Sequence, residues 1–335
     1  MLSNIKLDMI DPKMITLQQK KIYQDYCRDI SFDDFVKKAN QIYFDLEPEV
    51  YNEKHPEIDK FEADRWNNLA KKYFIADKPL RILDLGSGSG FVAEHVCRNL
   101  KKEDTFVFSD VSEKMLDYCK NKFKDKFNCK LEFKRLGGEL LDFPTNSFDI
   151  VSMNSVLHHI PDTEKILEEV NRVLKFGGSL IIAHEVNKAF FENKIIFTNY
   201  KIFRVLGNKK AFLESLFNHI GLLSFYERYF KVDKPGDYDA LLDKVNKELL
   251  EQKVIYKPLS PSKMGLIMET YSSIGFDVDG LANYTANLTL VEKTTYNHLN
   301  DNPTSWILKL YDKFLSILFP NSGKSFIAIF QKSSK

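Results

Sequence analysis

The sequence of 335 residues lacks the features that define several large classes of protein. It has 48 lysines and arginines against 47 aspartates and glutamates, so it carries no basic surplus of the kind that usually accompanies nucleic-acid binding. Its four cysteines are widely spaced and contain no Cys-x-x-Cys pair, which argues against a disulfide framework and a zinc knuckle. Nucleic acid is therefore an unlikely partner, and no metal site is expected.

Long hydrophobic runs are also missing. No segment reaches the roughly 18 apolar residues that a membrane span needs, and the N-terminal stretch has no apolar region typical of a signal peptide. We therefore expect a reduced, cytoplasmic protein without a transmembrane segment. Hydrophobic residues make up 44% of the chain and charged residues 28%, which excludes disorder as its dominant state.

Glycine is scarce, with 14 residues, yet Gly86, Gly88 and Gly90 fall within five positions. Such a concentration indicates a place where the backbone must approach a ligand or a neighbouring segment closely. The cluster lies between a short apolar run at 81–86 and a helical pattern at 91–100. Because the spacing is G-x-G-x-G and no Lys-Ser or Lys-Thr follows, it matches neither the dinucleotide fingerprint nor a phosphate-binding P-loop.

Short apolar runs alternate with helical patterns over residues 81–185, which predicts βαβ units and a parallel sheet. The expected strands are 81–86, 105–110, 130–136, 148–154 and 179–185. Helices are expected before residue 75 and through the aromatic-rich stretch after Glu185. Further along, the pattern predicts a sheet-flanking helix at 260–276, with Ser260 and Gly275 as its caps, then a strand at 277–284 and a final strand at 324–332.

A carboxylate, Asp110, ends the strand that follows the glycine turn. In open α/β sheets ligands bind at the carboxyl ends of the strands, and an acid at this position accepts both hydroxyls of a ribose. The turn and the acid together indicate a nucleoside bound without a pyrophosphate. S-adenosyl-L-methionine has that shape.

Three segments make the resemblance specific: RILDLGSGSG, FSDVSEKML and FPTNSFDIVSMNSVLHHIPDTEKILEEVNRVLKFGGSLII. Over residues 80–185 the chain resembles the class I S-adenosylmethionine-dependent methyltransferases. A weaker similarity returns in IGFDVDG and SFIAIFQK, at the places of that family's sixth and seventh strands. The resemblance implies a Rossmann-like α/β fold whose seven-stranded sheet is mostly parallel, with an antiparallel last strand.

The resemblance also implies roles for individual residues. Asp84 and the glycine turn would face the methionine half of the cofactor, and Asp110 would hold the ribose. The full set of implied cofactor-binding residues is Asp84, Gly86, Ser87, Gly88, Gly90, Asp110, Val111, Met115, Gly138, Glu139 and Asn154. Val111 and Met115 would pack on the adenine, while Asn154 would approach the methionine amino group or the substrate. An acid that the family often uses to bind adenine is replaced by Gly137, so this contact passes to Gly138 or Glu139.

Methyl transfer from a sulfonium needs alignment and exclusion of water, and a general base only where the nucleophile is protonated. The candidates for such a base or for other catalytic duty are His159, His184 and Glu185, near the carboxyl edge of the sheet. His158 is a candidate at the same edge, although the resemblance implies that the pair His158 and His159 recurs across the family as a structural feature.

The expected organisation has four parts: an N-terminal helical cap (1–75), the cofactor-binding core (76–186), a helical aromatic-rich lid (187–258) and the completion of the sheet with an inserted helix (259–335). Tyr51 and His55 are expected to complete the substrate pocket. The inserted helix at 305–319 has a stripe of Trp306, Leu310, Phe314 and Leu318. We expect this stripe to pack against its own domain, with a dimer contact or a membrane surface as alternatives.

These features predict methyl transfer to an oxygen, nitrogen or carbon of a small, hydrophobic or aromatic acceptor, since binding pockets are mostly apolar with a few polar anchors. A homodimer is compatible with the sequence. Methylation of RNA or protein is an alternative that a basic surface beside the pocket would favour. A non-catalytic cofactor-binding or regulatory module on the same fold is the other alternative, which Gly137 keeps open.

Overall fold

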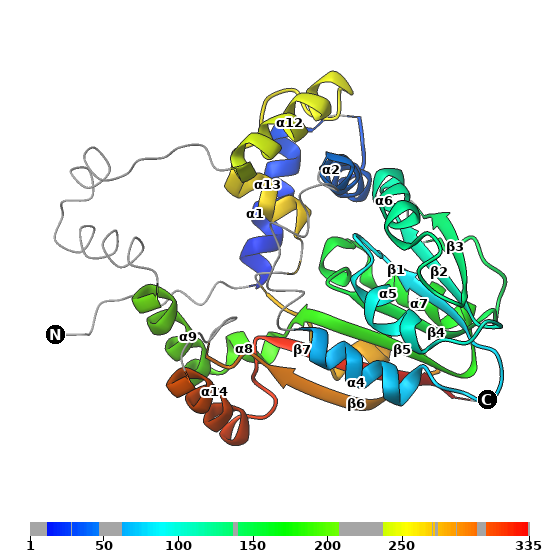
Figure 1. Cartoon of the computed structure of the whole chain (residues 1–335). Helices are drawn as coiled ribbons and strands as arrows, with labels where there is room; N and C mark the ends of the chain where they lie inside the picture. Colours follow the sequence, from blue (N-terminus) through cyan, green and yellow to red (C-terminus); the bar gives the residue numbers. More distant parts are fainter. Residues whose placement is uncertain are drawn as a thin grey trace.

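The computed structural model describes residues 12–27, 29–46, 62–136, 140–207, 237–269, 271, 274–285, 287–299 and 306–333. Its centre is a seven-stranded sheet in the order β3-β2-β1-β4-β5-β7-β6 (Figure 1). The strands are β1 (Arg81–Leu85), β2 (Thr105–Asp110), β3 (Lys130–Arg135), β4 (Phe148–Asn154), β5 (Leu174–Val186), β6 (Leu288–Tyr296) and β7 (Ser325–Lys332). Strands β1 to β5 are parallel and β7 is antiparallel to both of its neighbours, which confirms the predicted fold.

Helices cover both faces of the sheet, which explains why the residues of β1, β2 and β4 are almost continuously buried rather than alternately buried and exposed. One face packs against α4 (Ala63–Tyr73), α5 (Phe91–Val96) and α6 (Glu113–Phe123). The other packs against α7 (Thr163–Val173) and the 3₁₀ helix η4 (Gly280–Tyr284). Two further short 3₁₀ helices are η2 (Cys97–Asn99) and η3 (Leu157–His159).

The sixth strand is not where the sequence places it. Residues 277–284, expected as a strand, form a turn and η4, because the Asp277 Oδ1 accepts the Gly280 N–H (3.2 Å) and the Asp277 carbonyl accepts the Leu281 N–H (3.0 Å). The strand beside β7 is instead β6, an edge strand whose polar and β-branched residues suit a half-exposed position.

The helix expected at 260–276 is also shorter. Ser260 does cap it, since its hydroxyl accepts the Lys263 N–H (3.4 Å), but α13 (Pro261–Met268) ends well before Gly275. Gly275 serves a different purpose: its φ is +69°, and a Cβ there would lie 2.5 Å from the backbone nitrogen of Lys188. Nor does α13 flank the sheet, because its apolar residues belong to a separate helical cluster.

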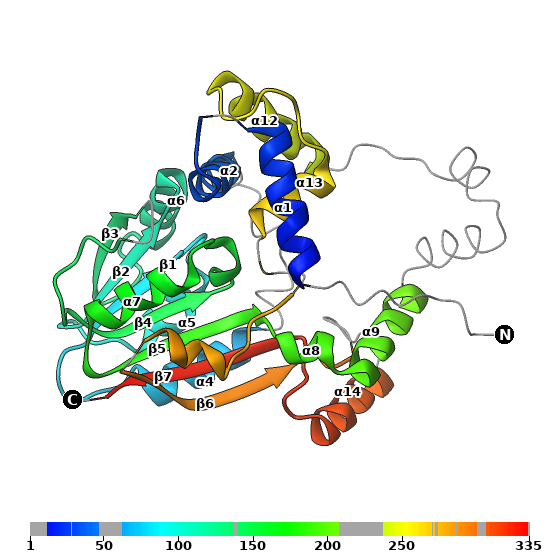
Figure 2. The same ribbon diagram turned by 180° about the vertical axis from the view of Figure 1, so that it is seen from behind.

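That cluster brings the N-terminal helices together with two helices from residues 237–268. It contains α1 (Pro12–Tyr26), α2 (Phe32–Leu46), α12 (Asp237–Glu251) and α13, packed around buried residues such as Phe35, Val245 and Met264. Figure 2 shows these helices together at one end of the sheet, with α2 beside α6. Part of the stretch 187–258 therefore packs with the N-terminal helices.

The other described part of that stretch lies elsewhere. Helices α8 (Lys188–Glu192) and α9 (Lys194–Gly207) pack with α14 (Trp306–Leu318) around Phe190, whose ring meets three other aromatic rings edge to face. The expectation that the α14 stripe packs against its own domain is wrong. Its four members, Trp306, Leu310, Phe314 and Leu318, are exposed, because the helix buries the opposite side around Leu315.

Candidate cofactor pocket

The glycine turn after β1 is fixed to the neighbouring strand β2. The Ser87 N–H donates to the Ser109 carbonyl (2.8 Å), and the Ser87 hydroxyl donates to the Asp84 carbonyl (2.9 Å). A Cβ at Gly86 would lie 2.5 Å from the Val156 side chain, and one at Gly90 would lie 2.2 Å from the Phe123 ring. At Gly88 a Cβ would meet nothing within 4 Å. Two glycines therefore permit close packing, and the third leaves open space above the turn.

Two buried aspartates lie under this turn. The Asp110 carboxylate accepts the backbone N–H of Gly88 and of Ser112 (both 2.9 Å), while Asp84 Oδ1 accepts the Ser152 hydroxyl (2.7 Å). Within the described residues, Asp84 Oδ2 is buried without a hydrogen-bond partner. Burial raises the pKa of Asp84 to about 7 and that of Asp110 to about 6. An anionic centre with an unsatisfied oxygen is suited to a cationic ligand.

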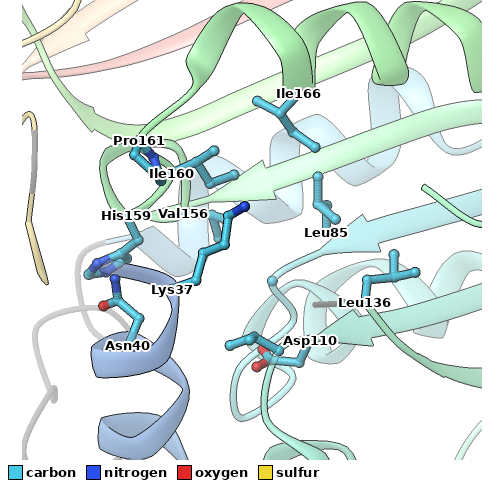
Figure 3. A pocket seen from close by; sticks show the side chains of 12 residues that line it. Lys37, Asn40, Leu85, Asp110, Leu136, Val156, His159, Ile160, Pro161 and Ile166 are labelled. Carbon is cyan, nitrogen blue, oxygen red and sulfur yellow. The ribbon is translucent and has the colours of Figure 1, made fainter. Parts of the chain in front are cut away.

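A largely apolar cavity opens beside the turn and Asp110 (Figure 3). Its lining residues are Lys37, Asn40, Leu85, Gly86, Asp110, Val111, Leu136, Val156, His159, Ile160, Pro161 and Ile166. Lys37 and Asn40 enter from α2, whereas Asp110 is the last residue of β2 and Val111 follows it. The cavity therefore lies between the carboxyl edge of the sheet and a helix that is remote in sequence.

His159 lines the cavity from η3 and Asn40 lines it from α2, and both donate a hydrogen bond to the same backbone carbonyl. The Met268 carbonyl accepts the His159 Nδ1–H (2.8 Å) and the Asn40 Nδ2–H (3.2 Å). Burial, assisted by the charge of His158, holds the pKa of His159 well below its usual value. His159 is therefore neutral, with its proton on Nδ1 and a lone pair on Nε2. The Asn40 Oδ1 is buried and has no hydrogen-bond partner among the described residues.

Glu185 is fully buried and is not among the residues that line the cavity. Its Oε1 accepts the backbone N–H of Val156 (2.7 Å) and Leu157 (2.6 Å), and its Oε2 pairs with His158 Nδ1 (2.8 Å). Burial lowers the pKa of His158, but the negative charge of Glu185 outweighs this and leaves the pKa raised. Glu185 therefore positions the loop after β4, which carries Val156 into the cavity wall.

His184 also lies outside the cavity lining, at a bulge in β5 where its φ is +56°. Its Nδ1 is 3.3 Å from the Glu62 Oε1 and 3.4 Å from the Tyr296 hydroxyl, which donates to the Glu62 Oε2 (2.9 Å). Burial would raise the pKa of Glu62, but its contacts with His184 and Arg65 keep it below the usual value. The Arg65 guanidinium stacks over the Tyr296 ring at 3.8 Å. We call these four residues the Glu62 cluster.

The remaining sequence candidates separate into three groups. Gly86, Asp110 and Val111 line the cavity as expected. Met115 is fully buried without lining it, and the Asn154 Oδ1 accepts the Trp66 indole N–H (2.9 Å). Four candidates, Tyr51, His55, Gly138 and Glu139, lie outside the described residues. No sequence signal marks Lys37, Asn40 or Glu62, because each lies in an ordinary helical pattern.

Comparison with known proteins agrees with this geometry. Residues 83–182 match the family model of a methyltransferase domain. Residues 83–182 belong to the class I S-adenosylmethionine-dependent methyltransferases. The cofactor of this family is S-adenosylmethionine, and the glycine turn, Asp110 and the unsatisfied Asp84 oxygen fit its backbone, ribose and cationic groups.

Among curated proteins, the chain is similar to the ubiquinone/menaquinone biosynthesis C-methyltransferase UbiE of Francisella tularensis subsp. novicida. The two are 34% identical over 122 residues, and this aligned region covers 35% of this chain and 48% of the relative. The chain is 29% identical over 167 residues to the demethylmenaquinone methyltransferase of Bacteroides fragilis, covering 49% and 68%. The chain thus spans about half the length of the first of these relatives. A solved S-adenosylmethionine-dependent methyltransferase from Aquifex aeolicus is 24% identical, with a TM-score of 0.33 over 39% of this chain and 67% of that one.

In the part of the chain that the structure describes, no helix has the length and apolar character that crossing a bilayer requires.

Proposed function

We propose that this protein transfers the methyl group of S-adenosylmethionine to a small hydrophobic acceptor held between the glycine turn and helix α2. The observation that carries the proposal is the cavity itself. One side has the turn and Asp110, and most of the rest is apolar. Such a lining is suited to a hydrophobic molecule with one polar group. The names of the quinone-methylating relatives support the same class of acceptor.

The residues that would hold the cofactor are the turn from Gly86 to Gly90, Asp110 and Val111. When bound, S-adenosylmethionine supplies an electrophilic methyl group on a positively charged sulfur. Above pH 7, where both carboxyl groups are ionised, Asp84 and Asp110 would attract the cationic cofactor, and the open space above Gly88 would admit it next to the backbone. Val156 and Ile160 exclude water from the same cavity.

His159 and Asn40 would orient the acceptor. The Asn40 Oδ1 would accept a hydrogen bond from an O–H or N–H of the acceptor other than the group that is methylated, which would satisfy an otherwise unpaired buried oxygen. The neutral His159 would have a lone pair on Nε2. This lone pair would receive the proton of the reacting acceptor group as its nucleophilic atom bonds to the methyl carbon. Because the pKa of His159 is low, this transfer favours an acceptor with an acidic proton, such as a phenol or an enol.

The experiment that tests the proposal is a product assay with a panel of small phenols, hydroquinones and aliphatic alcohols. Formation of S-adenosylhomocysteine and a methylated product from one apolar phenolic member is expected. Asn40→Ala should raise KM for that acceptor with an unchanged affinity for S-adenosylmethionine. Methylation of RNA or protein with no transfer to any small acceptor would contradict the proposal. Cofactor binding without any transfer would favour the regulatory module.

A further inference from the structure

Helix α14 exposes a broad apolar face. Six large hydrophobic side chains on it are between 52% and 74% exposed: Trp306, Ile307, Leu310, Phe314, Ile317 and Leu318. At about 100° per residue these positions lie within one third of the helix circumference. Monomeric proteins seldom expose so continuous an apolar surface without a partner. Two isoleucines of the adjacent helix α9, Ile195 and Ile202, are exposed as well.

The rest of α14 is firmly attached to the protein. Leu315 is buried, and Tyr311 contacts α9 through the Phe203 ring (5.9 Å between centroids) and through a hydrogen bond to Asn199 (3.3 Å). Both views show α9 and α14 side by side, away from the centre of the sheet (Figures 1 and 2). The exposed face is therefore a rigidly presented surface, which we call the α14 face.

Apart from Asp312, the charged residues of α9 and α14 are basic. Lys309 and Lys313 are exposed on α14, and Lys194 and Lys201 lie on α9, which has no acidic residue. The one acid of α14, Asp312, is turned inward, where its Oδ1 accepts the Leu299 N–H (2.7 Å). An apolar face with flanking lysines complements an anionic lipid surface. Two copies meeting through this face would bring lysines of the same sign together.

The α14 face also lies at the functional edge of the sheet. Helices α8 and α9 follow the end of β5, and α14 connects β6 to β7, where Val186 and Tyr296 both pair with Ser325. This is the carboxyl edge of the parallel strands, where the glycine turn also lies. With 13 residues, α14 is too short to cross a bilayer, but long enough to lie in its interface.

We propose that the α14 face docks the protein on an anionic lipid bilayer, with the apolar side chains in the interface and the lysines on the headgroups. Docking in this orientation turns the carboxyl edge of the sheet toward the lipid. A hydrophobic acceptor dissolved in the bilayer then reaches the cavity without crossing water. This last consequence rests on the proposed function, whereas the docking does not.

Binding is measured by flotation of the full chain with vesicles of phosphatidylglycerol and phosphatidylcholine, and with vesicles of phosphatidylcholine alone. The protein is expected to float with the anionic vesicles and to be released by high salt. Trp306 reports the contact directly. It is 74% exposed, while Trp66, the only other tryptophan of the sequence, is fully buried. The emission is therefore expected to shift to shorter wavelengths when anionic vesicles are added.

The decisive variant is Leu310→Glu/Phe314→Glu. Both side chains are exposed, so the fold should persist, and vesicle binding should fall by about tenfold or more. The matched control is Ile75→Glu/Val291→Glu, which adds the same charge at two exposed apolar positions on α4's C-terminal side and on β6. This control should bind as the unmodified protein does.

Three results would overturn the proposal: no binding of the unmodified protein to anionic vesicles, equal loss in the two double variants, or a solution dimer that only Leu310→Glu/Phe314→Glu dissociates. The last result would assign the α14 face to a second copy. Because the vesicle assay uses neither cofactor nor acceptor, its outcome is independent of the product assay. Methylation of a soluble acceptor without vesicle binding would remove the docking and leave the proposed function intact.

Discussion

Two buried polar centres lie near the carboxyl edge of the sheet, and they differ in how completely their charges are paired. In the Glu62 cluster both carboxylate oxygens have partners, and the pKa of Glu62 is lowered. At the cofactor pocket, burial raises the pKa of Asp110, which lines the cavity, and of Asp84, which is buried beneath the glycine turn. Asp84 Oδ2 and Asn40 Oδ1 have no hydrogen-bond partner among the described residues. Buried polar groups whose hydrogen bonds are complete stabilise a fold, whereas buried polar groups without partners are typical of a site that binds a ligand.

The largest expected effect is a difference in the free energy of unfolding between a variant of the Glu62 cluster and a variant of the cofactor pocket. Glu62→Ala leaves the partly buried Arg65 without its counter-charge and the buried Tyr296 hydroxyl without its acceptor, so the free energy of unfolding should fall by about 3 kcal/mol. Asp84→Asn removes a charge that burial already disfavours, and it should leave the stability nearly unchanged while weakening cofactor binding. Chemical denaturation and calorimetry measure the two quantities. Equal destabilisation by both variants would remove the distinction.

The second prediction concerns the two histidines. His159→Gln should lower kcat by about 100-fold, because it removes the proposed proton acceptor from the cavity wall. His184→Gln should change kcat little, since His184 lies in the Glu62 cluster. Steady-state kinetics with the acceptor found by the product assay provide the comparison. A larger loss for His184→Gln would move the base to the Glu62 cluster.

The third prediction is a pH dependence of cofactor affinity. Burial raises the pKa of Asp84 to about 7 and that of Asp110 to about 6, so affinity for the cationic cofactor should rise between pH 5.5 and 8, by up to about tenfold per pH unit between pH 6 and 7 and more steeply below pH 6, where both carboxyl groups are protonated. Stability of the free protein should change in the opposite direction. The raised pKa means that the folded state binds the proton more tightly than the unfolded state, so stability falls as pH rises from about 4 to 7. Asp84→Asn should flatten both profiles.

The sequence predicted the parts of the site that depend on local order. A strand end, a glycine turn and the acid after the next strand are close in the chain, and the parallel sheet necessarily brings them together. Lys37 and Asn40 escaped prediction because they reach the cavity only through the packing of α2 against α12 and α13. Helical periodicity alone does not distinguish that packing from solvent exposure.

The regions outside the shared core were less predictable for related reasons. The strand β6 is at the edge of the sheet, so its sequence has more polar residues than a buried strand and gives a weaker signal. The α14 stripe was recognised as a face, but periodicity indicates only which residues share a face and not what covers it.

The most direct test of the central claim is a calorimetric titration of the protein with S-adenosylmethionine and S-adenosylhomocysteine, with NAD as the negative control. Binding of the first two with Kd of about 10 μM or below, no binding of NAD and at least a tenfold weaker Kd in Asp110→Ala are predicted. The Asp110 carboxylate is the expected ribose anchor, and the matched variant Glu62→Gln should bind the cofactor as the unmodified protein does. Unchanged affinity in Asp110→Ala, or no binding of either sulfur compound, would contradict the account.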